Sequence, residues 1–205
     1  MQSSKNSGNI SYVVDYFNVF SDYREVYYKN NSKDFHETKY KTIKQDTESF
    51  FDVFFTLYLQ KMNIDANQSN FIFIIKKIYN YEEILASILE KYKYVHIRFV
   101  LVYEKYNDKL IEKNKDDFIC QYLIAVFNTN TILISNDNYK DKLMYTSAFL
   151  TNSRINIQVL QYQTSTKTIT RSSTFLIIDE TIINKIISRK ITRKNMKKEQ
   201  FALLV

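Results

Sequence analysis

Glycine, proline, tryptophan and cysteine are nearly absent from this chain of 205 residues, which has one Gly, no Pro, no Trp and one Cys. A single glycine, Gly8, excludes the glycine-rich loops that bind dinucleotides or nucleotide phosphates, because those motifs need at least two glycines. The lone Cys120 excludes an intramolecular disulfide and a multi-cysteine zinc module, and His36 and His96 add few zinc ligands. A site that holds a hard divalent cation through acids alone stays open.

Long apolar runs are missing as well. No run approaches the ~18 residues that a membrane-spanning helix needs, and the polar start MQSSKNSGN lacks an apolar signal core. We therefore expect an intracellular protein without a membrane segment, cytoplasmic or nuclear. The net charge of +7 favours anionic partners, which are nucleic acid or an anionic membrane face. The abundant Lys, Asn, Ile and Tyr are typical of an A+T-rich coding genome, such as that of some viruses.

Strand-like and helix-like segments alternate along the chain. We expect strands at 10–20, apolar up to Val14 and interrupted by Asp15, and at 71–78, 94–103, 131–135 and 155–163, with a further strand-like segment at 174–179. We expect helices at 47–62, with Thr47 as N-cap, and at 81–92, 116–127 and 139–150. This alternation predicts an α/β fold with a mostly parallel central sheet between layers of helices. Residues 1–180 would form one domain with a loop insertion at about 27–46, and 181–205 a basic tail or helix.

Acidic residues stand where ligands bind in such folds, at the carboxyl ends of the strands. Asp15 ends the first strand, Asp137 follows the fourth, Asp141 comes one helical turn later, and Asp116 and Asp117 begin the intervening helix. Two carboxylates at ~5 Å repel by roughly 3 kcal/mol at an effective dielectric near 20. A cluster would therefore be protonated or would bind Mg²⁺ or Mn²⁺. For Asp137 taken alone, helix capping is the better explanation. For the whole set a metal is favoured, because capping does not explain Asp15.

Three segments in this order, VVDYFNVF (13–20), KDDFICQYLIA (115–125) and ILISNDNYKDK (132–142), resemble the PIN-like metal-dependent nucleases. The likeness is greatest to the NYN branch, which contains the Regnase-type endoribonucleases, and it spans roughly residues 10–163. Asp15 and Asn18 match an Asp-x-x-Asn pattern at the end of the first strand. Asp116 and Asp117 match an adjacent Asp pair. The segment 135–141 matches a Ser-Asn-Asp sequence that a further Asp follows.

The resemblance implies a Rossmann-like, PIN-type three-layer sandwich that hydrolyses single-stranded or stem-loop RNA with Mg²⁺ or Mn²⁺. The metal ligands it implies are Asp15, Asp137, Asp141 and one of the Asp116/Asp117 pair, for which Asp117 is our choice. Asn18 would orient a water molecule or an acid. The zinc finger of some relatives is absent, so a homodimer or a protein partner would recruit the RNA. The alternatives are an inactive RNA-binding or scaffold protein on this fold and a DNA-directed 5′ nuclease.

Basic and aromatic residues supply candidates for contact with RNA. The basic candidates lie beside the acids and in the tail, and they are Lys140, Lys142, Arg189, Lys190, Arg193 and Lys194. For the tail, a solvated basic surface is the alternative. Tyr16 replaces the small residue that usually follows the first Asp in the family, and we expect it to narrow the cleft. Tyr16, Tyr23 and Tyr139 could stack on bases, although packing explains each of them as well.

Overall fold

The computed structural model describes residues 10–30, 41–76, 81–102, 115–126, 130–137, 154–188 and 193–194. Its strands are β1 (Ile10–Asp15), β2 (Ser69–Lys76), β3 (His96–Val102), β4 (Thr131–Ile134), β5 (Arg154–Gln163), β6 (Thr168–Ile177) and β7 (Arg193–Lys194). Its helices are α1 (Tyr16–Asn30), α2 (Lys41–Val53), the π-turn η1 (Phe54–Tyr58), α3 (Leu59–Lys61), the 3-10 turn η2 (Ala66–Gln68), α4 (Tyr81–Lys91), α5 (Lys115–Val126) and α7 (Glu180–Ser188). No helix in these ranges is long and apolar enough to cross a membrane.

The strands form one sheet with the order β6-β5-β3-β2-β1-β4-β7. Strands β3, β2, β1, β4 and β7 run parallel to one another. Strand β5 is antiparallel to both of its neighbours, β3 and β6. The prediction of an α/β fold with a mostly parallel sheet is thus confirmed. The strand expected at 155–163 exists, but it does not continue the parallel alternation. Only residues 164–167 separate β5 from β6, and so short a connection can join only antiparallel strands.

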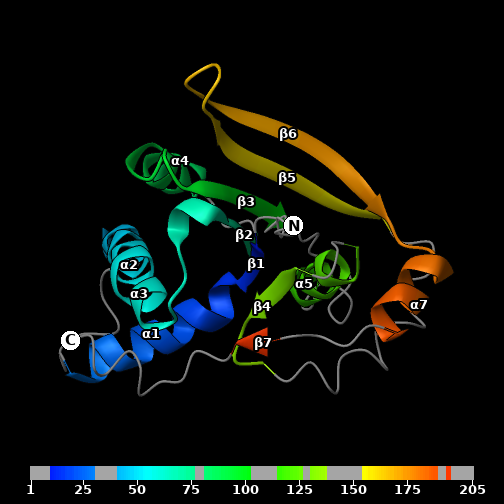
Figure 1. The fold of residues 1–205 in the computed structure, drawn as a ribbon, viewed down its shortest axis with the longest axis horizontal. Coiled ribbons are helices and arrows are strands. Elements are labelled where there is room, and N and C mark those ends of the chain that lie inside the picture. The colour runs from blue at the N-terminus through cyan, green and yellow to red at the C-terminus, as the bar shows by residue number, and fades with distance from the viewer. Residues whose placement is uncertain are drawn as a thin grey trace, which may run out of the picture.

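Helices pack on both faces of the sheet (Figure 1). Successive side chains of a strand point to opposite faces, so Tyr12 and Val14 of β1 join one hydrophobic cluster and Val13 joins the other. The first cluster contains the buried side chains of α1, α2, α3 and α4 and is rich in aromatic rings. The second contains those of α5 and α7. The chain therefore has apolar cores on both sides of β1.

The amino-terminal part holds more helix than the sequence predicted. Helix α1 begins directly after Asp15, so residues 16–20 do not continue the strand. Its buried side chains at 16, 19, 20 and 23 follow the helical period, which strand-favouring aromatic and Val residues had masked. The loop expected at 27–46 is helical at 27–30 and again from Lys41, and 31–40 lies outside the described residues. Thr47 is no N-cap, because it is buried inside α2.

The predicted tail contributes two elements to the fold. Helix α7 buries Ile183 and Ile186 in the second hydrophobic cluster. Strand β7 extends the sheet beside β4, with Arg193 opposite Leu133 and Lys194 opposite Ile134. At least these parts of 181–205 therefore belong to the same folded unit as the sheet.

Among the residues that the structure describes, two that are not glycine have left-handed backbone. Asn63, just after α3, has a φ of 51°, and Lys167, in the turn between β5 and β6, has a φ of 53°. Glycine usually fills such positions because it has no Cβ to clash. The near absence of glycine from the sequence thus leaves an Asn and a Lys in this conformation.

Candidate metal centre

Asp15 lies where the strand order reverses. The chain first adds β2 and β3 on one side of β1, and it then places β4 on the other side of β1. Asp15 pairs in register with Ile74 of β2, and the preceding Val14 pairs with Ile134, the last residue of β4. In open α/β sheets, ligands bind outside the carboxyl ends of the strands at such a reversal. The end of β1 is therefore the expected place for a site.

Three carboxylates from two elements meet at this place. Asp15 comes from the end of β1, and Asp116 and Asp117 come from the first turn of α5. Carboxylate oxygens of the three lie within 4.8 Å of one another, and the residues are only 3%, 4% and 7% exposed. The positive end of the α5 dipole favours acids in its first turn, but two carboxylates at this separation still repel by roughly 3 kcal/mol at an effective dielectric near 20. Both members of the predicted Asp pair reach Asp15.

The pKa of Asp116 is raised by its position in this cluster. Burial, followed by the neighbouring charge of Asp117, raises the pKa of Asp116 to about 7, against the opposing effect of Lys76 and with a further increase from Asp15. The Lys76 ammonium lies 3.4 Å from Asp116 Oδ2. The other oxygen, Oδ1, is buried and accepts no hydrogen bond from the described residues.

An oxygen-only site with a buried acceptor that lacks a partner among the described residues fits a hard divalent cation. Mg²⁺ and Mn²⁺ prefer carboxylate ligands, and a bound cation would remove the cost of leaving Asp116 Oδ1 without a partner. Within the described part of the chain, the residues that fit a metal are thus these three acids.

Ser135 connects the end of β4 to the cluster. Its hydroxyl lies 3.0 Å from Asp15 Oδ2 and 3.2 Å from Asn18 Oδ1, and it can donate its one hydrogen to either. The same oxygen accepts a hydrogen bond of 3.1 Å from the backbone amide of Asp137. The charged acceptor, Asp15, forms the stronger bond, so Ser135 holds the Asp15 carboxylate in place.

Side chains of helix α1 form hydrogen bonds with the segment that follows β4. Asn18 Oδ1 accepts a hydrogen bond of 2.7 Å from the backbone amide of Asn136, and the Asn136 side-chain amide donates to the Asp22 carboxylate. Asn18 and Asp22 are four residues apart and so lie on the same side of α1. The carboxamide of Asn18, predicted to orient a water or an acid, is thus used to position the backbone next to Ser135.

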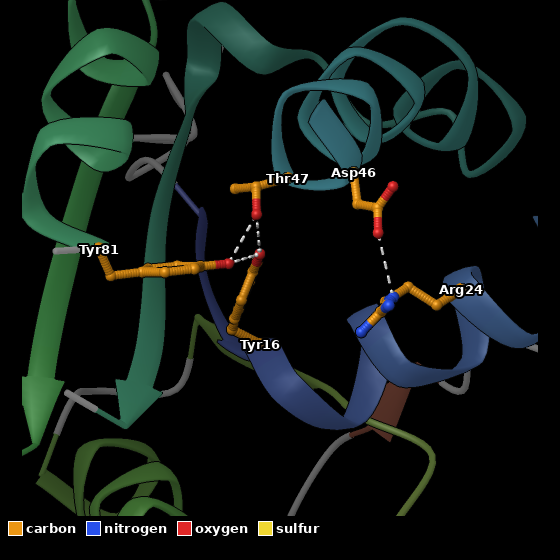
Figure 2. A network of polar contacts seen from close by, with 5 residues as sticks. All are labelled: Tyr16, Arg24, Asp46, Thr47 and Tyr81. Carbon is orange, nitrogen blue, oxygen red and sulfur yellow. Dashed lines mark hydrogen bonds and ion pairs between the residues drawn. The ribbon is translucent and has the colours of Figure 1, made fainter. Parts of the chain in front are cut away.

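Tyr16 points away from the acids into the protein. Its hydroxyl, that of Tyr81 and that of Thr47 form a buried triangle, with separations of 2.5, 2.7 and 3.3 Å (Figure 2). Beside the triangle, Arg24 pairs with Asp46 at 3.2 Å. Burial raises the pKa of Tyr81 to about 12 and that of Tyr16 well above its ordinary value, so both hydroxyls stay neutral.

The expectation that Tyr16 narrows the cleft is therefore wrong. Since Tyr16 and Tyr23 are buried in the aromatic core, neither can stack on a base. The hydroxyl triangle instead joins the first residue of α1 to α2 and α4. It thereby fixes the backbone immediately after Asp15.

The remaining predicted site residues have mixed outcomes. Asp137 is partly buried two residues beyond Ser135, but its carboxylate is not among the three that converge. The backbones of Arg193 and Lys194 lie beside the end of β4. The other predicted residues lie outside the described part of the chain, and they are Asp141, Tyr139, Lys140, Lys142, Arg189 and Lys190.

Sequence reasoning missed Lys76 and Asp22. Lys76 ends the apolar strand SNFIFIIK, and a charge at the carboxyl end of a parallel strand was the available signal. Asp22 could have been found only if 16–30 had been read as a helix, because only the helical period places it on the same side as Asn18.

No family model, curated protein or solved structure matches this chain.

Proposed function

We propose that this protein is a metal-dependent endoribonuclease of the PIN-like type, with a Rossmann-like three-layer sandwich as its fold. The observation that carries the proposal is the convergence of Asp15, Asp116 and Asp117 at the reversal of strand order. Carboxylate oxygens that are this close and this buried would be stabilised by a divalent cation, and the fold brings them to its ligand-binding edge.

Each residue of the site has a part in this activity. Asp15, Asp116 and Asp117 hold Mg²⁺ or Mn²⁺, with Asp137 and Asp141 as the further predicted ligands. The ion supplies positive charge that stabilises the phosphodiester oxygens during hydrolysis and lowers the pKa of a water molecule. Ser135 fixes the Asp15 carboxylate, so the first ligand is oriented before the ion binds.

RNA is the substrate we propose, because the chain is basic and the basic residues continue to the same edge of the sheet. The net charge is +7, and β7 brings the backbone of Lys194 level with the last residue of β4. Residues placed there are close to the site where the phosphodiester would bind. The predicted contacts Lys140, Lys142, Arg189 and Lys190 would extend this surface.

The test is cleavage of single-stranded and stem-loop RNA with Mg²⁺ or Mn²⁺, compared with EDTA. Asp15→Asn and Asp137→Asn should each abolish cleavage while the folded state is retained, since an amide lacks the charge that binds the ion. Asp52→Asn is the matched control, because the Asp52 side chain is 45% exposed and pairs with Lys91 of α4 and not with the acids of the site. Cleavage that persists in EDTA or in Asp15→Asn would contradict the proposal.

Other outcomes point to the alternatives. Binding of RNA without cleavage in Mn²⁺ would indicate an RNA-binding or scaffold protein on this fold. Cleavage of DNA but not RNA would indicate a DNA-directed nuclease.

A further inference from the structure

Lys76 places a positive charge beside the three carboxylates of the site. It is the last residue of β2 and lies two residues beyond Ile74, which is level with Asp15. Its ammonium lies 3.4 Å from Asp116 Oδ2, while about one third of its side chain, 34%, remains exposed. Lys76 thus reaches a buried carboxylate and the solvent from the edge of the sheet where ligands bind.

The charges of the site are unequal without a metal. When all three carboxylates are ionised, Lys76 balances one of their three negative charges and leaves an excess of two for other cations. A divalent ion balances that excess, and it competes with Lys76 for Asp116 because both are attracted to the same oxygens. The lysine side chain is long and has rotatable bonds, so its ammonium can turn toward the solvent when an ion takes over the carboxylates.

We propose that Lys76 is the counter-ion of the carboxylate cluster in the metal-free protein and the residue that contacts a phosphate oxygen of the RNA once a divalent ion is bound. This inference rests on the proposed nuclease function. A phosphodiester bound to an ion on Asp116 lies within reach of an ammonium that already pairs with this carboxylate. The ammonium binds a phosphate as a compact point charge.

The two roles predict effects of opposite sign when the charge is removed. In Lys76→Met, Mn²⁺ affinity should increase by roughly threefold to tenfold, because the variant has no like charge near the ion. The kcat/KM for RNA cleavage should fall by about 10- to 100-fold, because the phosphate no longer has a charged hydrogen-bond donor at this position. A merely structural role would weaken metal binding and catalysis together.

The experiment measures Mn²⁺ binding by titration calorimetry and RNA cleavage on the same proteins. Lys91→Met is the matched control, since Lys91 pairs with Asp52 on the outer helices and should change neither quantity. Lys76→Arg keeps the positive charge and should keep Mn²⁺ affinity near that of the unaltered protein.

Chemical rescue covers the case in which Lys76→Met does not fold. The only native cysteine, Cys120, is buried, so 2-bromoethylamine should alkylate Lys76→Cys selectively and restore an ammonium. Alkylation should lower Mn²⁺ affinity and recover cleavage. No change in either quantity would show that Lys76 has neither role.

The outcomes separate the two proposals. If the unaltered protein binds no Mn²⁺ and cleaves no RNA, the nuclease function is wrong and the inference fails with it. If it does both, but the neutral Lys76 variants bind Mn²⁺ no more tightly or cleave at the unaltered rate, only the inference on Lys76 is overturned.

Discussion

The pKa of Asp116 makes the metal-free protein less stable as the pH rises. The folded-state pKa is about 7 and the ordinary value is 3.8, so the folded protein binds more protons than the unfolded chain between these values. Its stability therefore falls through this window and stays low above pH 7. The difference between the two pKa values corresponds to ~4 kcal/mol of unfolding free energy. This is a large part of the roughly 5–15 kcal/mol that typically stabilises a domain.

Asp116→Asn should remove this effect, because the amide does not ionise. We expect the free energy of unfolding in EDTA to fall from pH 5 to pH 8 by about 2–3 kcal/mol more in the unaltered protein than in the variant. Adding Mn²⁺ at pH 8 should restore stability to the unaltered protein and much less to Asp116→Asn. Urea unfolding followed by circular dichroism at each pH measures this, since the chain has no Trp for fluorescence.

Glu90→Gln is the control, because Glu90 is a carboxylate on α4 that is 59% exposed and pairs with Lys93. Its pH dependence of unfolding should equal that of the unaltered protein. If Asp116→Asn also has the same pH dependence as the unaltered protein, Asp116 ionises freely in the folded state. The electrostatic argument for a divalent ion at this site would then have no basis.

Three further predictions follow from particular residues. Tyr16→Phe should lower the free energy of unfolding by about 1–2 kcal/mol in urea titrations, because it removes one of three mutually bonded buried hydroxyls; an unchanged value would show that the triangle contributes nothing. Lys167→Gly should raise it by ~0.5–1 kcal/mol, because glycine tolerates a positive φ, and a decrease would contradict this. Alanine at Arg189, Lys190, Arg193 and Lys194 should flatten the log–log salt dependence of RNA binding between about 50 and 200 mM by roughly 0.7 for each phosphate that these residues neutralise, and an unchanged slope would remove them from the RNA-binding surface.

The parallel part of the sheet was predictable because its strands are buried on both faces. Such strands read as continuous apolar runs, as in FIFII at 71–75, where every residue is buried. Strand β6 was predicted only in part, from the segment TFLIID at 174–179. Its sequence TITRSSTFLI is mostly exposed, and its pairing with β5 depends on the turn at 164–167 rather than on an apolar pattern. The antiparallel hairpin was missed for that reason.

Helix α1 was missed because its residue types favour a strand, whereas the spacing of its buried residues is helical. Its sequence begins YFNVF, and aromatic and β-branched residues favour strands. The buried positions nevertheless repeat at helical spacing, and packing against α2 and β2 overrides the local preference. Tertiary contacts of this kind cannot be read from a single sequence.

The acids of the site were predicted from position in the fold, and their partners were not. Asp15 ends a strand at the reversal of strand order, and Asp116 and Asp117 begin the helix that crosses to β4, so topology alone brings them near one another. The rotation of α5 about its axis decides whether Asp116, Asp117 or both of them lie next to Asp15. Its hydrophobic side chains at 118, 119, 120 and 124 are all buried, and they leave this rotation open on the sequence alone.

The positions of Ser135, Asn18 and Asp22 show how Asp15 and the segment after β4 are held in place without a metal. The mutual repulsion of three carboxylates tends to separate β1 from α5, and the ammonium of Lys76 beside Asp116 opposes it. Ser135 ties the end of β4 to Asp15, and Asn18 and Asp22 tie α1 to Asn136. The hydroxyl triangle of Tyr16, Thr47 and Tyr81 then anchors α1 from the opposite side. Asp15 is consequently fixed on both flanks, by Ser135 at its carboxylate and by Tyr16 at the next residue of the backbone. A site held in this way is formed before an ion binds, so the free energy of ion binding is not spent on ordering its first ligand.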